Sequence, residues 1–387
     1  MPHLWQTFSN LCLFFLFLED KTAFCAIVPL QKIILTLFLR TNFMIYKLLG
    51  NTGLRVSELC LGTMTFGTDW NTGADKAESQ KMFEKFVEAG GNFFDTANRY
   101  TEGTSERFLG EFIKADRDRY VIASKYTLYD KRDDVNAMGN HRKNLMRSLD
   151  HTLKRLQTDY LDLLWVHMWD FTTPIEEVMR GLDDVVRSGK VHYIGISDTP
   201  AWVVAKANTL AEGRGWTKFS ALQIEWSLIE RTVERDLIPM AKHFGLAVTP
   251  WSPLGAGLLT GKYNAGMQGQ GRLSEKSVKY TPHNIEIAKK VSEVAQKLGA
   301  TSAQVALAWL RQQGETVFPI LGARSAAQLE DAMGCLSVEI PADLMNDLHQ
   351  ASQIDLGFPH KFLETPGVQD VIFGDFKETL KRQRRNF

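Results

Sequence analysis

Four side chains that could together reduce a carbonyl group stand at or near the ends of short apolar runs. Asp95, Lys125 and His167 each end such a run. Tyr100 follows shortly after Asp95. Addition of hydride to a carbonyl leaves an alkoxide, which needs a proton, and a positioned tyrosine hydroxyl can supply one. The four residues therefore predict carbonyl reduction with Tyr100 as the proton donor.

Each member of this set has a distinct expected role. A free tyrosine has a pKa of about 10, and a cationic Lys125 beside Tyr100 would stabilise the phenolate and lower the pKa of Tyr100. Asp95 would keep Lys125 charged, because a buried ammonium without a partner is costly. His167 would donate a hydrogen bond to the substrate oxygen and polarise the carbonyl.

Taken singly, the same residues have ordinary structural interpretations. Asp95 could cap a helix, and Lys125 could be a solvated strand end. His167 could be a satisfied polar group, and Tyr100 could pack at a rim. Because these residues occur together at the ends of successive apolar runs, a catalytic role is favoured over the separate structural ones.

The elements that must position these residues form a regular alternation. Eight short apolar runs are separated by longer stretches, several of which carry apolar residues at helical spacing. The runs are Leu59–Gly62, Asn92–Asp95, Tyr120–Lys125, Tyr160–His167, Val191–Ser197, Ala221–Glu225, Leu246–Pro250 and Val317–Leu321. Strands alternating with helices predict a parallel sheet, and eight such units predict a single (β/α)8 TIM barrel whose active site lies at the carboxyl ends of the strands.

Two further local signals support this architecture. A turn signal at 50–53 predicts a short hairpin of Lys47–Leu49 and Leu54–Val56 ahead of the barrel. A doubly wound dinucleotide fold would instead need GxGxxG directly after its first strand. The segment Gly62–Gly67 lacks the first GxG pair, so that alternative is disfavoured.

Composition narrows the class of protein. Lys plus Arg and Asp plus Glu both number 45, giving zero formal net charge, which argues against a nucleic-acid-binding protein. The four cysteines are scattered without CxxC pairs, so we expect a reducing, cytoplasmic location, a core role for Cys60 and no metal site.

The first 43 residues do not match the remainder. They carry two apolar stretches and fit a signal peptide, a membrane anchor, or residues upstream of the true start. We expect Met44 to begin the barrel domain, 44–387, with 1–43 outside the fold.

Several independent segments resemble the aldo-keto reductase superfamily, in particular its aryl-alcohol-dehydrogenase-like branch. The matching segments are Gly91–Ala97 with Tyr100, Ser105–Gly110, Leu153–Asp162 leading to His167, Gly189–Ser197 and Trp251–Leu254. The resemblance implies the catalytic set Asp95, Tyr100, Lys125 and His167, and NADP(H) lying extended across the barrel mouth.

The resemblance also implies a set of cofactor contacts. Trp251 would stack on the nicotinamide ring, while Ser197, Asp198 and Gln223 would hold its carboxamide. The pyrophosphate would lie within 252–262, where the expected contacts are Ser252, Pro253, Leu254, Gly257 and Lys262. Arg272 would belong to a flap, and Gly322, Arg324 and Gln328 would meet the adenosine end, with Arg324 on the 2′-phosphate.

Two positions depart from the family pattern. Asp198 stands where many members have Asn, so the carboxamide would meet an acceptor only. Asp331-Ala332 replaces a Glu-Asn pair that often binds adenine, which weakens the preference for NADPH over NADH.

Other functions remain open at this stage. Potassium-channel β subunits share the barrel and cofactor site as regulatory partners, although the position of His167 is Asn there. A barrel hydrolase could pair Asp95 with Glu225. The substrate would be a small carbonyl compound, with no nucleic acid or membrane partner expected for the barrel, and an oligomer is possible. Aromatic residues in the predicted loops suggest a pocket for aryl carbonyls: Trp70, Trp169, Phe171 and Trp202.

Overall fold

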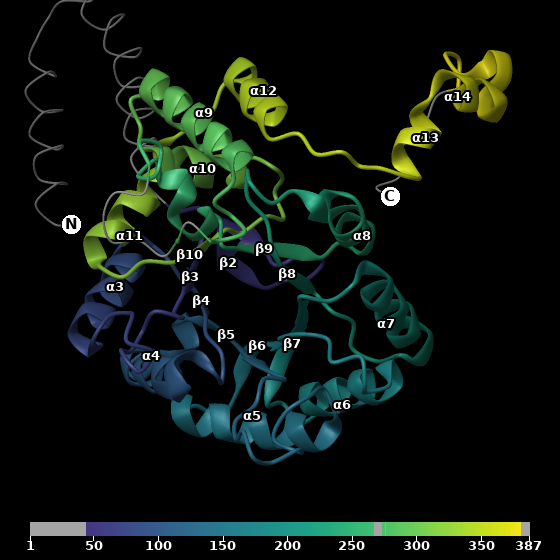
Figure 1. The fold of residues 1–387 in the computed structure, drawn as a ribbon. Helices are drawn as coiled ribbons and strands as arrows, with labels where there is room; N and C mark the ends of the chain where they lie inside the picture. Colours follow the sequence, from purple (N-terminus) through teal and green to yellow (C-terminus); the bar gives the residue numbers. More distant parts are fainter. Residues whose placement is uncertain (1–43, 267–272, 275, 381–387) are drawn as a thin grey trace, which may run out of the picture. The chain divides into compact units, whose positions relative to one another are not determined.

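The computed structural model describes residues 44–266, 273–274 and 276–380 (Figure 1). The expected role of Arg272 and the expectation for 1–43 lie outside these residues and stay predictions. Within the described part, no helix is long and apolar enough to cross a membrane.

Eight parallel strands form the predicted barrel. They are β3 (Cys60–Gly62), β4 (Phe93–Asp95), β5 (Val121–Tyr126), β6 (Leu161–Val166), β7 (Val191–Ser197), β8 (Ala221–Glu225), β9 (Ala247–Trp251) and β10 (Ile320–Leu321). From β3 to β9 each strand pairs with the next along the chain, and β10 pairs with β3. A bridge between Val248 and Val317 joins the last gap. The (β/α)8 fold class is therefore confirmed.

The last strand is shorter than the sequence predicts. The run Val317–Leu321 is interrupted, since Val317 bridges to β9 and the paired strand β10 begins only at Ile320. Pro319 has no N–H to give to a ladder, but its carbonyl accepts a hydrogen bond from the Cys60 N–H at 3.0 Å. The proline thus divides one predicted strand into two short pairings.

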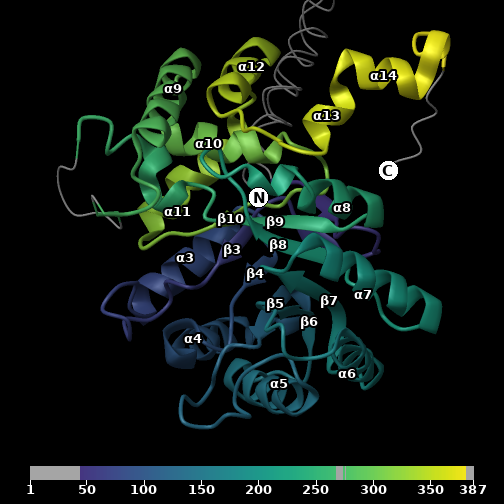
Figure 2. The ribbon, with the colours of Figure 1, turned by 45° about the vertical axis from the view of Figure 1, so that its right-hand side comes forward.

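Helices surround the strands, as Figures 1 and 2 show. Those between successive strands are α3 (Lys76–Glu88), α4 (Thr104–Ile113), α5 (Arg142–Leu156), α6 (Ile175–Arg187), α7 (Ala201–Arg214), α8 (Leu237–Phe244), α9 (Pro282–Leu298) and α10 (Ser302–Arg311). After β10 come α11 (Ala326–Met333), α12 (Ala342–Ala351), α13 (His360–Glu364) and α14 (Pro366–Phe373). Apolar residues at helical spacing predict helices over Ala77–Ala89, Leu145–Leu156 and Ile175–Val186. These are α3, α5 and α6, and their positions are confirmed.

Apolar packing divides into two layers. One cluster fills the space between strands and helices. A smaller one fills the barrel interior and includes Phe93, Trp165 and the buried thiol of Cys60, so the core role expected for Cys60 is confirmed. The predicted hairpin, β1 (Tyr46–Leu48) and β2 (Arg55–Ser57), is shifted by one residue at each strand.

Candidate active site

The centre of the site is a buried ion pair between adjacent strands. Asp95 ends β4, and Lys125 lies on β5. Their side chains are 3% and 0% exposed, and the Lys125 ammonium donates to the Asp95 carboxylate. The same ammonium donates to the Thr96 carbonyl at 2.9 Å and to the Tyr100 hydroxyl at 3.2 Å. Burial opposes the charged form of Lys125, but Asp95 and Tyr100 together outweigh it, and the pKa of Lys125 is raised above its ordinary value.

A strained turn carries Tyr100 to this lysine. The residues after it, Thr101, Glu102 and Gly103, have φ of 47°, 53° and 83°. Left-handed backbone costs a non-glycine residue about 1–2 kcal/mol, and such strain often marks a functional site. The Thr101 hydroxyl holds the turn by donating to the Phe66 carbonyl at 2.6 Å. The turn therefore fixes the direction of the Tyr100 ring.

The acidity of Tyr100 differs from the expectation. Sequence reasoning predicted a lowered pKa because of Lys125. In the structure, burial of the phenol is the largest influence and outweighs the lysine, so the pKa of Tyr100 is raised. Tyr100 is therefore held in its protonated form at neutral pH, the form that can donate a proton.

His167 completes the group at the end of β6. Its ring centroid lies 6.1 Å from that of Tyr100, with the rings at 85°. Burial, assisted by repulsion from Lys125, lowers the pKa of His167 well below its ordinary value. The imidazole is consequently neutral near pH 7, with one N–H donor. Its Nδ1 atom is buried without a hydrogen-bond partner, which leaves capacity for a ligand.

Residues of the 105–110 segment brace these strand ends. The Ser105 hydroxyl donates to the Thr63 carbonyl at 2.7 Å, linking α4 to the end of β3. The buried Glu106 carboxylate accepts from Ser124 at 2.6 Å and from Arg155 at 2.5 Å. Because Ser124 precedes Lys125 on β5, this network holds the lysine strand against α4 and α5.

The residues expected at the nicotinamide lie on β7, β8 and β9. Ser197 and Gln223 are buried, at 1% and 3% exposure. The Gln223 amide donates to Asp95 Oδ1 at 3.0 Å, so its nitrogen serves the ion pair. The indole N–H of Trp251 donates to Asp198 Oδ1 at 3.0 Å. Desolvation raises the pKa of Asp198, although the residue is exposed at the mouth.

Sequence reasoning missed a second ion pair at the mouth. Lys279 pairs with Glu225 at the end of β8 and donates to the Ser252 hydroxyl at 3.3 Å. Its ammonium lies 5.8 Å from the centre of the Trp251 ring. No local pattern marks a contact between residues so far apart in sequence. Glu225, considered above for hydrolysis, is thus neutralised by Lys279, as Asp95 is by Lys125.

The segment after β9 forms a tight glycine turn. Ser252, Ala256 and Gly257 have φ of 53°, 57° and 93°. A Cβ at Gly257 would lie 3.2 Å from Lys262 Cε and Nζ, so the lysine packs directly over the glycine. Turns of this kind expose backbone N–H groups that suit anions. Pro253 is buried and Leu254 half-buried.

Of the residues expected at the adenosine end, Gly322 and Arg324 lie before α11 and Gln328 lies in its first turn. Gly322 and Arg324 are exposed, and open space surrounds the position of a Gly322 Cβ. Gln328 accepts the Arg324 N–H at 2.9 Å, so this side chain shapes the loop. Asp331 accepts a hydrogen bond from Gln304 at 3.0 Å.

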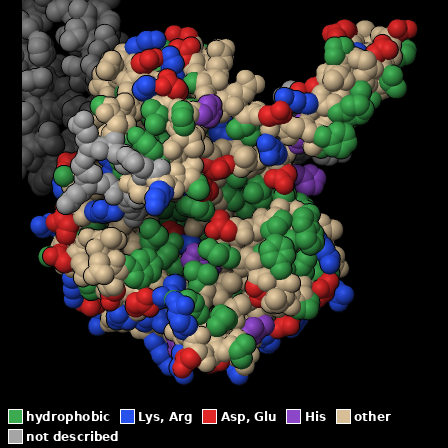
Figure 3. Space-filling view, viewed as in Figure 1, with side chains coloured by type: hydrophobic (Ala, Val, Ile, Leu, Met, Phe, Trp, Pro, Cys, Tyr) green, Lys and Arg blue, Asp and Glu red, His purple; other side chains and the backbone are tan. Residues whose placement is uncertain are grey.

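The four loop aromatics are not equivalent. The Trp70 ring packs edge-on against Tyr100, with centroids 6.5 Å apart. Phe171 and Trp202 are 70% and 63% exposed, whereas Trp169 packs against the core. Hydrophobic side chains also gather around the centre of the barrel face in Figure 3. Of these four aromatic residues, Trp70 is therefore the one that adjoins Tyr100.

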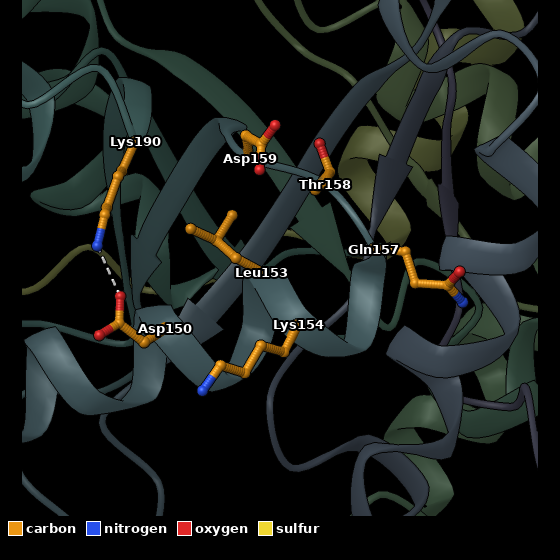
Figure 4. Close-up of a pocket in the computed structure, with 7 residues that line it drawn as sticks. All are labelled: Asp150, Leu153, Lys154, Gln157, Thr158, Asp159 and Lys190. Atoms are coloured by element: carbon orange, nitrogen blue, oxygen red, sulfur yellow. Dashed lines mark hydrogen bonds and ion pairs between the residues drawn. The ribbon is translucent and has the colours of Figure 1, made fainter.

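A depression of about 390 Å³ lies elsewhere, between the end of α5 and the starts of β6 and β7. Figure 4 shows its lining, with Lys190 paired to Asp150 at 2.7 Å. It is open and lies at the amino ends of the strands, the opposite end from Lys125. In barrels that end serves stability. Among the described residues, no group of three or more His, Cys, Asp or Glu could hold a metal ion.

Known reductases and dehydrogenases are similar to this chain over most of its length. The chain is 39% identical over 327 residues to a norsolorinic acid reductase of Aspergillus flavus, covering 82% of this chain and 83% of that protein. It is 38% identical to an NADP(+) aryl-alcohol dehydrogenase of Phanerodontia chrysosporium (84% and 87%). A putative aryl-alcohol dehydrogenase of Saccharomyces cerevisiae is 37% identical (82% and 89%).

The family pattern of these proteins extends over most of the barrel. Residues 58–353 match the Aldo/keto reductase family, a span that runs from just before β3 to just after α12. Family members act on small carbonyl compounds, as the expected chemistry of the mouth requires. The chain therefore belongs to the aldo/keto reductase family and is an oxidoreductase.

Proposed function

We propose that the chain reduces aldehydes and ketones to alcohols with NADPH, with Tyr100 giving the proton. The observation that carries this proposal is the Tyr100 hydroxyl held 3.2 Å from a buried, charged Lys125. As the substrate oxygen gains negative charge, Tyr100 gives it a proton and the nearby ammonium stabilises the resulting phenolate. Neutral His167 donates a hydrogen bond to the same oxygen and orients it.

The residues around the mouth fit a nicotinamide dinucleotide. The Nδ1 atom of His167 is buried without a hydrogen-bond partner and is available to a ligand. A Cβ at Gly257 would crowd Lys262, so the glycine allows this lysine to lie directly over the turn. When bound, NADPH would supply the hydride. Trp251, Ser197 and Asp198 would hold the nicotinamide end, and the turn 252–262 the pyrophosphate.

The choice of NADPH rests on the other end of the site. Arg324 is an exposed guanidinium directly before α11, and a planar guanidinium suits phosphate oxygens. Gly322 leaves room beside it, and an NADP(+) enzyme is among the relatives. We infer that Arg324 binds the 2′-phosphate. The edge of Trp70 beside Tyr100 favours aryl carbonyls.

The test is reduction of aromatic aldehydes by the full chain, followed through NADPH absorbance. Tyr100→Phe removes the proton donor, and we expect kcat to fall by about 10²–10⁴-fold. Tyr193→Phe makes the same change on β7, in the layer of the barrel interior, and is the matched control. NADPH binding by Tyr100→Phe, read from tryptophan fluorescence, shows that the variant is folded.

The outcomes separate the competing functions. Turnover that collapses in Tyr100→Phe but not in Tyr193→Phe supports the proposal. NADPH binding without turnover of any carbonyl would favour a cofactor-sensing role like that of potassium-channel β subunits. Turnover that survives Tyr100→Phe would remove Tyr100 as the donor.

A further inference from the structure

The last part of the described chain does not pack like the rest. Figures 1 and 2 show α13 and α14 projecting away from the barrel. We call residues 356–380 the C-terminal arm. None of its residues is buried, whereas helices α3–α12 all contribute buried residues to the core. The arm is therefore attached to the barrel without being part of its core.

The arm nevertheless carries many large apolar side chains. Their exposed fractions run from 44% to 86%, and Figure 3 shows hydrophobic groups along the arm. They are Phe358, Phe362, Leu363, Val371, Ile372, Phe376 and Leu380. Contiguous apolar exposure of this kind marks an interaction site.

The two helices of the arm are too short to be stable without packing against another surface. Helices below about 12–15 residues are marginal in water without tertiary packing. Helix α13 has 5 residues and α14 has 8, and neither buries any of them. Within the described residues, no surface of the barrel covers these two helices.

The base of the arm is fixed in direction. Arg235 donates to the Asp355 carbonyl at 2.7 Å, and Arg231 donates to Ser352 at 2.8 Å. Both arginines lie between β8 and α8. These bonds hold Ser352 and Asp355, which precede the arm, so the arm leaves the barrel from a fixed point.

We propose that the partner is a second copy of this chain, and that two arms pack against each other about a two-fold axis. An isologous contact is self-complementary, since each arm offers the apolar set that the other needs. A fully exposed aromatic side chain presents roughly 200 Å², so Phe358, Phe362 and Phe376, which are 83%, 53% and 70% exposed, offer about 400 Å² per chain, to which the four aliphatic side chains add. A stable interface of standard size needs about 800 Å² per partner.

The charge of the arm supports a protein partner over an anionic membrane. Its acidic residues, Glu364, Asp370, Asp375 and Glu378, outnumber its lysines, Lys361 and Lys377. Binding to anionic lipid needs an excess of Lys and Arg on the polar face. The basic run 381–385 follows in sequence but lies outside the described residues, so lipid binding is included in the test.

The experiment is light scattering coupled to gel filtration on the full chain at micromolar concentration. We expect twice the chain mass of 43.8 kDa. Val371→Asp, at a position 86% exposed, should return the protein to the single-chain mass. Val135→Asp makes the same change at an 80% exposed position outside the arm and should stay dimeric. Phe362→Ser tests the other helix of the arm.

This proposal does not depend on the reductase chemistry, because its readout is mass. Circular dichroism and carbonyl reduction by Val371→Asp would show an intact barrel. A single-chain mass for the unaltered protein, or an undiminished dimer in both arm variants, would overturn the proposal. So would wild-type binding to phosphatidylserine vesicles that Val371→Asp abolishes without any change in mass.

Discussion

The Lys125 ammonium donates a hydrogen bond to the Tyr100 hydroxyl while it is paired with the buried Asp95 carboxylate. The lysine is thus shared between a permanent negative charge and a group that becomes negative only when it loses its proton. Burial raises the pKa of Tyr100, and Asp95 raises that of Lys125. Under the proposed function, proton transfer from Tyr100 would therefore be favourable only when the substrate oxygen has become basic.

This balance predicts opposite pH dependence for the two directions of reaction. A Tyr100 pKa above its ordinary value of about 10 keeps the hydroxyl protonated at lower pH. The kcat/KM for reduction should be flat from about pH 6 to 9 and fall only above about 10. Alcohol oxidation, which needs the phenolate as base, should rise across the same range. A fall in the kcat/KM for reduction with a midpoint near pH 8 would contradict the raised pKa of Tyr100.

Breaking the buried pair should cost stability as well as activity. Lys125→Met leaves Asp95 as an uncompensated buried charge, and such losses destabilise by about 3–5 kcal/mol. Adding Asp95→Asn removes that charge, so the double variant should regain much of the stability while remaining inactive. Urea unfolding measures the first effect and carbonyl reduction the second. A double variant no more stable than Lys125→Met would show that the charge is not the cause.

His167 should act as a neutral donor. Removing one preorganised donor to a developing oxyanion typically costs about 10²–10³ in kcat, so His167→Ala should lower kcat by that order with a smaller change in KM. Because its pKa lies well below the ordinary value, activity should not fall between pH 7 and about 5.5 through protonation of this residue. If the activity of the wild-type protein fell with a midpoint near pH 6.5, and this fall were absent in His167→Ala, His167 would not act as a neutral donor.

The sequence predicts the barrel and the centre of the site for the same physical reason. Strands buried on both sides are continuous apolar runs, and a polar residue that ends such a run, like Asp95 or Lys125, must lie at the mouth. Contacts between distant loops leave no such pattern, which is why Lys279 with Glu225 was not foreseen. The raised pKa of Tyr100 was also missed, since spacing reveals a neighbouring charge but not the depth of burial.

Arg324 should decide between the two dinucleotides. If it binds the 2′-phosphate, Arg324→Met should raise the KM for NADPH about tenfold, equivalent to about 1.4 kcal/mol, and leave the KM for NADH nearly unchanged. Arg214→Met alters an arginine at the last turn of α7 and serves as the control. Equal losses for NADPH and NADH would place the role of Arg324 elsewhere on the cofactor.

Asp198 offers the sharpest test at the nicotinamide end. Its φ of 43° is a conformation that Asn adopts readily, and the side-chain carbonyl introduced by Asp198→Asn would still accept from the Trp251 indole. An amide can also donate a hydrogen bond, which an ionised carboxylate cannot. Asp198→Asn should therefore tighten NADPH binding about 3–10-fold, the value of one net hydrogen bond.

The affinity of the wild-type protein for NADPH should also depend on pH. Desolvation raises the pKa of Asp198, so this affinity should increase as the pH falls toward that pKa and the protonated Asp198 gains a donor of its own. The Asn variant should lack this dependence, and Asp198→Ala should weaken binding at every pH. Wild-type and Asn affinities that are equal and vary together with pH would mean that residue 198 does not meet the carboxamide.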